Sequence, residues 1–357
     1  MTSKLPPYLL EHLPWEQEAD PIWPATTLVL RRNLSRRLFP PKLKEREALS
    51  VEEDLKNALL AQADFTEPQF FSAEMLSATD KEYLFEHFLC REGFQNTLRG
   101  QGFLIEKSAS ILALFNIEDH LQLHLSACKA GLEKAWTSLS QISSSIAKIL
   151  DFAYAPKWGF LTSHPSQCGT ALQATAFLHL PALIRMERIQ DALAKQKEEE
   201  IEVSGMQGTP DVFLGDLLIL ANRFSLGVSE DKIFYALHSA ATELTLLEKK
   251  LREELRHDSK AELKDLVFRA FGLLMHSYQL QTPETLDALS LMKLGLDLGW
   301  INKITDQALN EVFFQCRKAH LTYLAEEKDP KNLPHARAAF IHKKLAPMQL
   351  VADPNLR

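Results

Sequence analysis

Two segments of the chain alternate between hydrophobic and polar residues, the period of a β-strand with one buried face. In DHLQLHLSA, residues 119–127, leucines form one face, and two histidines and a glutamine form the other. In LQATAFLHL the polar face carries Gln173, Thr175 and His179, and the following Pro181 suits the first turn of a helix. The sequence therefore predicts strands that carry an uncharged polar face.

Elsewhere, hydrophobic residues recur at the spacing of amphipathic helices. Such a helix is predicted over residues 128–150, another begins at Pro181, and Ser229 resembles an N-cap. The C-terminal part of the chain is almost entirely helical. We therefore expect an α+β fold, with a mixed portion over residues 1–245 and an all-helical portion over residues 255–347.

The charge of the chain excludes some classes of partner. The 357 residues have a formal net charge of −7, which gives no broad electrostatic attraction to nucleic acid or to an acidic membrane. No run of about 18 apolar residues occurs, so we expect no membrane span. One run of arginines predicts a solvated basic face: Arg31, Arg32, Arg36 and Arg37.

The cysteines and histidines do not predict a metal site. Four cysteines are widely spaced without a Cys-x-x-Cys pair: Cys90, Cys128, Cys168 and Cys316. Reduced thiols in a cytoplasmic protein fit this spacing better than a disulfide framework or a zinc site. The strand face of His120, Gln122 and His124 lacks a carboxylate or cysteine at ligand spacing, which favours a polar sheet face.

Several segments, in their order along the chain, resemble the motifs of the phosphagen (ATP:guanido) kinase family. TTLVLRRNL is similar to Ser-Ser-Arg-Ile-Arg-Leu-Ala-Arg-Asn-Leu, and NIEDHLQL to Asn-Glu-Glu-Asp-His-x-Arg. LTSHPSQCGTALQATAF is similar to a Cys-Pro-Thr-Asn turn followed by Gly-Thr-Gly-Leu-Arg-Ala-Ser, and SGMQGTPDVF to Arg-Gly-x-x-Gly-Glu. FRAFGLL and MKLGLDLGWI resemble the extra domain of the bacterial protein-arginine kinase branch.

This resemblance implies a fold, a cofactor and partners. It implies a catalytic domain with a largely antiparallel sheet flanked by helices, followed by a helical C-terminal domain that forms a homodimer. It also implies phosphoryl transfer from Mg-ATP to arginine. The bacterial branch works with a small zinc-binding activator protein and Clp-type protease machinery, so similar partners, and client proteins in protein quality control, are expected here.

The resemblance also predicts a degenerate nucleotide site. The family binds ATP with arginines, whose planar guanidinium groups suit bidentate phosphate contacts. Five of these arginines fall on uncharged residues here: Thr27, Val29, Gln122, Gln173 and Ser204. His87, in LFEHFL, matches a family histidine near the nucleotide, but a neutral imidazole cannot replace five guanidinium groups.

The residues expected to act on the guanidinium substrate are only partly kept. Glu118 matches the second glutamate of Asn-Glu-Glu-Asp-His, whereas Thr209 stands at the glutamate of Arg-Gly-x-x-Gly-Glu. His164 stands at the reactive cysteine, and Cys168 is expected to be a small buried side chain rather than a substitute. The phosphoarginine-reading motif Arg-Asp-x-x-Arg-Ala reads LPHARA, which retains Arg337.

Typical hydrogen-bond energies indicate how far these replacements weaken nucleotide binding. Hydrogen bonds to charged groups contribute about 1.5–3 kcal/mol each, so five lost contacts remove at most about 7–15 kcal/mol. A millimolar to micromolar affinity corresponds to only about 4–8 kcal/mol, so these losses leave little room for ATP binding in the manner of the family.

In the alternative that the motifs are misaligned, a two-residue shift presents Arg31, but no arginine is expected near Gln122, Gln173 or Ser204.

The sequence leaves three functional hypotheses. The first is a protein-arginine kinase homologue that has lost most phosphotransfer and acts as a pseudokinase or adaptor. The second is an active ATP-dependent protein-arginine kinase with a rewired nucleotide site. In the third, a less charged ligand binds a polar pocket made of Gln122, Gln173, Ser204, Thr209 and His87.

Overall fold

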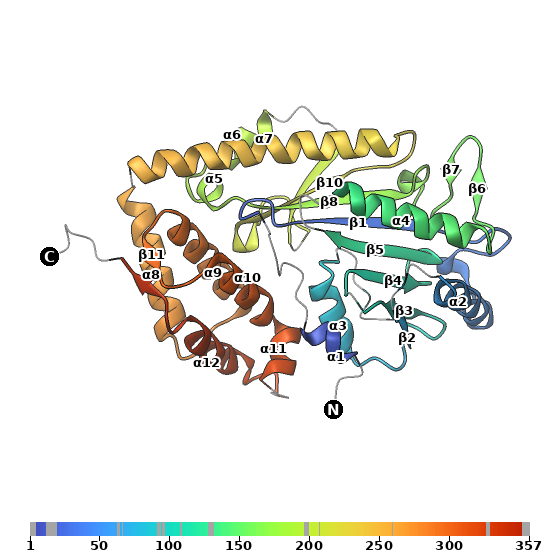
Figure 1. Cartoon of the computed structure of the whole chain (residues 1–357), viewed down its shortest axis with the longest axis horizontal. Helices are drawn as coiled ribbons and strands as arrows, with labels where there is room; N and C mark the ends of the chain where they lie inside the picture. The colour runs from blue at the N-terminus through green and yellow to red at the C-terminus, as the bar shows by residue number, and fades with distance from the viewer. Residues whose placement is uncertain are drawn as a thin grey trace.

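A large antiparallel sheet forms the centre of the protein (Figure 1). The computed structural model describes residues 5–11, 20–62, 65, 67–90, 94, 97–107, 109–127, 132–195, 200–206, 208–258, 260–325 and 329–351. Within these residues the sheet has eight strands, and every neighbouring pair is antiparallel. The predicted α+β fold with a largely antiparallel sheet is therefore confirmed.

The sheet runs from β2 at one edge to β9 at the other. Its spatial order is β2 (Gln69–Ser72), β3 (Gly102–Ile105), β4 (Ile111–Phe115), β5 (Leu121–Ala127), β1 (Ala25–Arg32), β8 (Leu172–His179), β10 (Leu217–Asn222) and β9 (Ile201–Gly205). A separate hairpin pairs β6 (Tyr154–Ala155) with β7 (Gly159–Phe160). The two alternating segments of the sequence are β5 and β8, as predicted.

Helices cover the leucine-rich face of this sheet. α4 (Leu132–Ala147) packs on β5 and β1, and α7 (Glu230–His257) packs on β8 and β10. Ser229 is the N-cap of α7, as predicted, because its Oγ accepts a hydrogen bond from Lys232 N at 3.3 Å. The helix predicted from Pro181 is two short helices, α5 (Pro181–Arg185) and α6 (Ile189–Ala194).

Smaller elements complete the N-terminal part. α1 (Pro7–Glu11) and α3 (Ala78–His87) join β3 and β4 in a second hydrophobic cluster, which includes Tyr83, Phe103 and Leu114. Among the residues that the structure describes, the remaining elements of this part are α2 (Glu45–Leu60) and three single-turn helices, η1 (Pro40–Lys42), η3 (Pro165–Gln167) and η4 (Leu214–Asp216).

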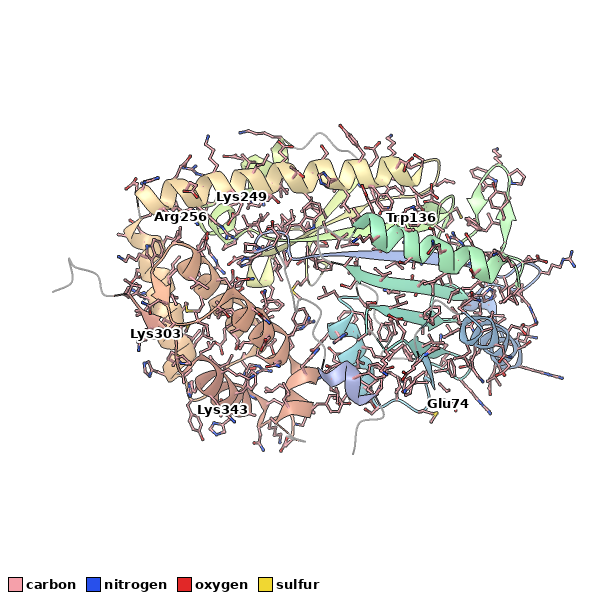
Figure 2. The ribbon with its side chains drawn as sticks, in the orientation of Figure 1. Glu74, Trp136, Lys249, Arg256, Lys303 and Lys343 are labelled. Carbon is pink, nitrogen blue, oxygen red and sulfur yellow. The ribbon has the colours of Figure 1, made fainter. Side chains whose placement is uncertain are left out.

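Over its described residues, the C-terminal part is helical except for one short strand pair. Its helices are α8 (Ala261–His276), α9 (Thr282–Asp297), α10 (Asp306–Gln315), α11 (Lys318–Leu324) and α12 (Leu333–Leu345). β11 (Ile301–Asn302) pairs with β12 (Gln349–Leu350), a feature that the helical pattern did not predict. Figure 2 shows Lys303 and Lys343 on the outer side of this part and Lys249 on α7; all three are exposed.

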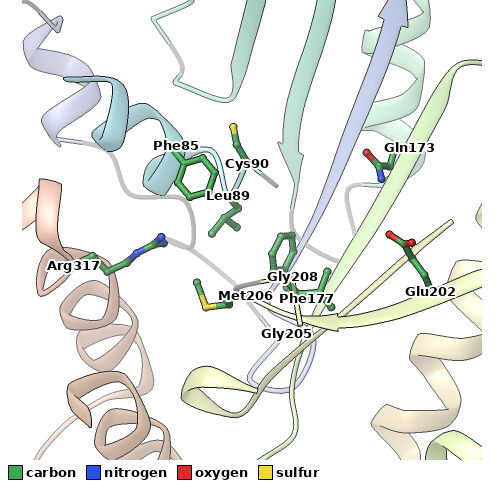
Figure 3. A pocket seen from close by; sticks show the side chains of 11 residues that line it. Phe85, Leu89, Cys90, Gln173, Phe177, Glu202, Gly205, Met206, Gly208 and Arg317 are labelled. Atoms are coloured by element: carbon green, nitrogen blue, oxygen red, sulfur yellow. The ribbon is translucent and has the colours of Figure 1, made fainter. Parts of the chain in front are cut away.

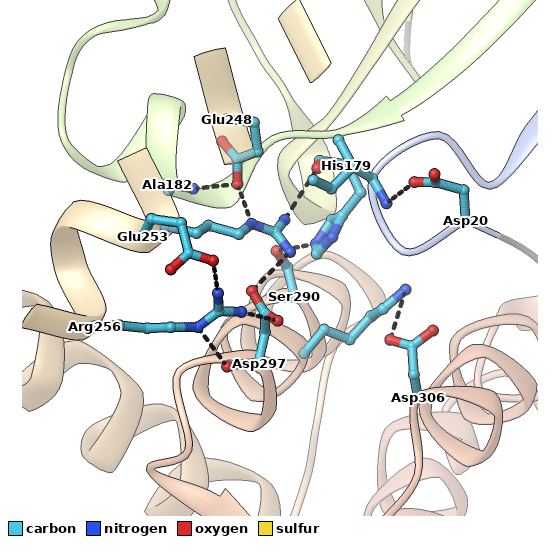
Figure 4. Close-up of polar contacts among 12 residues, drawn as sticks. Asp20, His179, Ala182, Glu248, Glu253, Arg256, Ser290, Asp297 and Asp306 are labelled. Carbon is cyan, nitrogen blue, oxygen red and sulfur yellow. Dashed lines mark hydrogen bonds and ion pairs between the residues drawn. The ribbon is translucent and has the colours of Figure 1, made fainter. Parts of the chain in front are cut away.

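A buried polar network joins α7 to its surroundings (Figure 4). The Glu248 carboxylate accepts hydrogen bonds from Ala182 N at 3.0 Å and from Leu183 N at 2.9 Å, so it caps the first turn of α5. Arg252 Nε donates to Glu248 at 2.7 Å, and Arg252 Nη1 lies 3.4 Å from Asp297 Oδ2 in α9. α7 thus connects the sheet to the C-terminal helices without a break.

His179 belongs to this region rather than to the polar part of the sheet face. Its Nε2 lies 2.8 Å from Ser290 Oγ, and Ser290 Oγ donates to Asp216 Oδ2 at 2.5 Å. Burial lowers the pKa of His179 well below its usual value.

No helix in the described ranges is both long enough and apolar enough to cross a membrane.

The predicted solvated basic face is wrong for two of its four arginines. Arg31 and Arg32 are 1% and 6% exposed, whereas Arg36 and Arg37 are exposed. Arg31 and Arg32 end β1, where both faces of the strand are covered, so consecutive side chains are buried on opposite sides. The Arg32 guanidinium lies 3.6 Å from the ring centroid of Phe160, and burial lowers its pKa to about 9.

Candidate functional site

Three neighbouring strands bring most of the predicted nucleotide positions onto one face of the sheet. Val29 in β1 is paired with Gln173 in β8 and with His124 in β5. Paired residues of antiparallel strands point to the same side, and so do residues two apart along a strand. Thr27, Val29, Gln122 and Gln173 therefore share one face, which we call the polar sheet face. The sequence predicted this grouping from the motifs.

Ser204 lies on the same face but farther away. It is paired with Ile219 in β10, and Ile219 is paired with Phe177 in β8. One complete strand, β10, therefore separates Ser204 from the strand that carries Gln173. Ser204 is buried, with 6% of its surface exposed.

An arginine does occupy the polar sheet face. Arg31 lies two residues beyond Val29 and is paired with Gln122 in the β1–β5 register. Its Nη2 donates a hydrogen bond to Gln173 Oε1 at 3.0 Å, and its Nε lies 3.9 Å from Asp119 Oδ2. The expectation that no arginine stands near Gln122 and Gln173 is therefore wrong. The two-residue shift that presented Arg31 in the misaligned alternative agrees with this position, because residues two apart on a strand share a face.

The side chain of Asp119 and the backbone of Glu118 contact the segment that carries His164. Asp119, which is 0% exposed, accepts hydrogen bonds at Oδ1 from Asn33 Nδ2 at 2.5 Å and from Ser163 N at 2.7 Å. Ser163 Oγ donates to the carbonyl oxygen of Glu118 at 2.6 Å. Glu118 and the exposed His164 are thus in neighbouring segments at the end of the polar sheet face.

His120 and Cys168 are buried, and each contacts polar groups of the protein itself. Leu34 N donates to His120 Nδ1 at 2.9 Å, and His120 Nε2 lies 2.9 Å from Leu38 O, so the neutral ring with its proton on Nε2 fits both contacts. Burial lowers the pKa of His120 to about 4. Cys168 is buried, as expected, with its Sγ 3.6 Å from Thr162 Oγ1. Cys128 lies outside the described residues.

Two further predicted residues do not join the polar sheet face. His87, the last residue of α3, is buried in a stack of rings whose centroids lie 5.6 Å away at Tyr83 and 6.0 Å away at His320. Thr209 is exposed in the turn after β9, where its carbonyl oxygen accepts a hydrogen bond from Gly205 N at 2.7 Å. Of the five residues of the third hypothesis, Gln122 and Gln173 thus lie on the polar sheet face, with Ser204 farther along it.

Arg337 is an internal residue of the helical part. It is 3% exposed, and its Nε and Nη1 donate to the carbonyl oxygens of Cys316 and Leu280, each at 2.7 Å. Burial lowers its pKa from the usual value. The guanidinium that the resemblance assigns to phosphoarginine recognition thus binds the protein backbone in this structure.

A cavity of about 500 Å³ opens beside the polar sheet face (Figure 3). Its wall is apolar at Phe85, Leu89 and Phe177 and polar at Gln173, Glu202 and Arg317. Figure 3 shows Arg317 and Glu202 on opposite sides of it. Sequence reasoning missed Arg317, because only the packing of α11 against α3 brings this distant residue to the cavity.

The antiparallel sheet, its polar face and the helical C-terminal part fit the fold of the guanido kinase class. Residues 50–251 match the family described as ATP:guanido phosphotransferase, C-terminal catalytic domain, and residues 260–355 match the protein-arginine kinase McsB C-terminal domain. The chain belongs to the protein-arginine kinase family of ATP:guanido phosphotransferases. The resemblance drawn from the sequence is thereby confirmed.

Relatives agree with this assignment, and solved structures share the fold. The protein-arginine kinase of Chlamydia pneumoniae is 34% identical over 346 residues, covering 94% of this chain and 96% of the relative. That of Chlamydia muridarum is 32% identical over 324 residues, 88% of each chain. The duplicated taurocyamine kinase from Schistosoma mansoni shares the fold, with a TM-score of 0.58 and 24% identity over 70% of this chain and 37% of that chain. Lombricine kinase also shares the fold, with a TM-score of 0.57 and 17% identity. The match covers 71% of this chain and 73% of that chain.

Proposed function

We propose that this member of the protein-arginine kinase family has lost most phosphotransfer activity and acts as a pseudokinase or adaptor in protein quality control. One observation carries the proposal. The polar sheet face is uncharged at the positions where the family has arginines, and the arginine that lies there, Arg31, is buried against Asp119.

The charges near this face do not fit a triphosphate. Mg-ATP carries a net negative charge and is held by cations that are free to contact phosphate oxygens. Arg31 already faces Asp119, and Arg317 Nε lies 4.0 Å from Glu86 Oε1. Glu202 adds a carboxylate to the wall of the cavity. A phosphate bound here would compete with buried carboxylates for both arginines, which is costly.

The features that would serve an adaptor are intact. The hydrophobic core runs from the sheet through α7 into the C-terminal helices, so the family fold persists without its cradle of arginines. By analogy with the family, we infer a homodimer through the helical domain, and a small zinc-binding activator and Clp-type protease machinery as partners. Client proteins would be handed over without being phosphorylated by this chain.

Nucleotide binding gives the direct test. Isothermal titration of the purified full chain with Mg-ATP should show no saturable heat up to about 1 mM, a concentration at which a Kd of 100 μM would be obvious. An active family member serves as the positive control. Transfer of labelled phosphate to an arginine-rich protein by this chain, abolished by Glu118→Ala, would overturn the proposal.

One observation favours an alternative, an active kinase with a rewired nucleotide site. Arg31 contacts Gln173, and the backbone carbonyl oxygen of Glu118 accepts a hydrogen bond from Ser163 Oγ, so a cation and the retained glutamate lie near one end of the polar sheet face. This alternative predicts saturable Mg-ATP binding that Arg31→Gln abolishes. A flat titration of both proteins contradicts it.

A further inference from the structure

Cys90 and His124 form a thiol–imidazole pair on the polar sheet face. Cys90 lies just after α3, and His124 is in β5; Cys90 Sγ and His124 Nδ1 are 3.8 Å apart, within the range of a hydrogen bond to sulfur. The two residues are 8% and 5% exposed. Neither belongs to a motif that the sequence assigned to the reactive cysteine, a position held by His164.

The pair shares a small cavity with a cation. A cavity of about 10 Å³, the room of one water-sized molecule, is lined by Cys90 and His124 together with Arg31 and Gln173. Cys90 and Gln173 also line the cavity of about 500 Å³, so the two cavities adjoin. An imidazole base and a nearby guanidinium both favour the thiolate, the nucleophilic form of cysteine.

We propose that Cys90 is a peroxide-reactive cysteine. His124 Nδ1 accepts the thiol proton, and the thiolate sulfur attacks one oxygen of hydrogen peroxide. The S–O bond forms as the O–O bond breaks, and the leaving hydroxide takes the proton from His124 to become water. Sulfur gives up two electrons and peroxide gains them, which leaves Cys90 as a sulfenic acid.

Hydrogen peroxide is a small, neutral oxidant that can reach Cys90 from the cavity of about 500 Å³, because Cys90 lines that cavity as well. The added oxygen would lie between α3 and β5, against Arg31 and Gln173. This inference is independent of the proposed function, because it requires neither nucleotide nor phosphotransfer.

Cys168 offers a matched control within the same chain. It is 9% exposed, close to the 8% of Cys90, but its Sγ contacts Thr162 N at 3.5 Å and Thr162 Oγ1 at 3.6 Å in place of an imidazole. Burial alone would give the two thiols similar rates of oxidation. A difference in rate therefore reports the surroundings of Cys90.

The experiment treats the reduced full chain with hydrogen peroxide for set times, followed by catalase, denaturation with dimedone and peptide mass spectrometry. Cys90 should form sulfenic acid at least about tenfold faster than Cys168, and His124→Gln should slow Cys90 at least about fivefold without changing Cys168. Equal rates for the two cysteines, or a Cys90 rate unchanged in folded His124→Gln, would overturn the proposal. If that variant does not fold, the ratio of the Cys90 oxidation rate to the Cys168 oxidation rate in the unmodified chain is the test of the proposal.

Discussion

The Arg31 guanidinium donates a hydrogen bond to the side-chain oxygen of Gln173 across the β1–β8 pair, with Nη2 and Oε1 3.0 Å apart. Gln173 stands where the family motif has an arginine. A second guanidinium at that position would face Arg31 at short range and repel it, whereas the amide oxygen accepts its hydrogen bond. The neutral residue at 173 and the cation at 31 are therefore compatible as a pair.

Replacing Arg31 should destabilise the fold strongly. Arg31→Met removes the cation but leaves Asp119 buried with its charge, and breaking a buried pair in this way costs about 3 kcal/mol or more. Urea denaturation followed by circular dichroism measures the change in unfolding free energy. Arg36→Met is the matched control, since Arg36 is an exposed member of the same arginine run.

A double-mutant cycle separates the pair from other losses. Asp119→Asn keeps a side-chain oxygen for Asn33 Nδ2 and Ser163 N, so the double variant with Arg31→Met should be less destabilised than the sum of the two single variants. Strict additivity would show that the 3.9 Å contact between Arg31 and Asp119 contributes nothing.

Replacing Glu248 should also lower stability. Glu248→Ala uncaps the N-terminus of α5 and leaves Arg252 without its 2.7 Å partner, so a loss of about 3 kcal/mol is expected. The neighbouring Lys249→Ala, on the exposed side of the same helix, should leave the denaturation midpoint unchanged. Equal effects of the two variants would contradict the capping role.

His120 should make the protein less stable in mild acid. Its folded pKa of about 4 lies below its ordinary value of 6.5, so its contribution is fully present above pH 6.5 and is lost as pH falls towards 4. The shift corresponds to about 3 kcal/mol. Asp216, whose pKa is raised by burial to about 6, contributes the opposite slope between its two pKa values.

The comparison with a variant isolates the histidine from the aspartate. His120→Asn keeps an acceptor near the position of Nδ1, so unfolding free energies measured from pH 7 to 4.5 should fall less steeply for the variant than for the unmodified chain. Nuclear magnetic resonance titration gives a second readout. An ordinary pKa near 6.5 for the His120 ring would contradict the prediction.

Glu86 should hold α11 against α3. Its carboxylate accepts hydrogen bonds from Ala319 N at 3.2 Å and from His320 N at 3.4 Å, and lies 2.9 Å from His320 Nδ1. Glu86→Ala should therefore raise hydrogen exchange at the first amides of α11 at least about tenfold while α12 stays protected. Glu86→Gln keeps an acceptor oxygen, so its exchange rates should lie between those of the unmodified chain and of Glu86→Ala. Unchanged exchange in both variants would contradict the role of Glu86 in holding α11 against α3.

Local patterns predicted the elements well, because they depend on neighbours in sequence. The alternation in β5 and β8, the proline that begins α5 and the Ser229 cap each involve residues within one or two turns. The motifs also grouped Thr27, Val29 and Gln173 correctly, since a motif carries the register of its strand with it.

Relationships between distant segments could not be predicted in this way. The face on which Arg31 lies follows from its spacing to Val29, but its partners Asp119 and Gln173 follow from strand pairing across the sheet. His179 alternates with Gln173 yet contacts Ser290 of α9, because the C-terminal helices pack at the end of β8 where His179 lies. Single-chain periodicity contains no information about which part of a face will be covered.

The position of Arg31 along β1 also sets a distance. Residues two apart on an antiparallel strand are separated by about 6.8 Å. The side chain of Arg31 spans this offset, because its Nη2 reaches Gln173 Oε1 at 3.0 Å. The guanidinium therefore lies beside position 173, where the family has an arginine, although its backbone is two residues beyond Val29. Its ion pair with Asp119, rather than its place along β1, is what would withhold it from a phosphate.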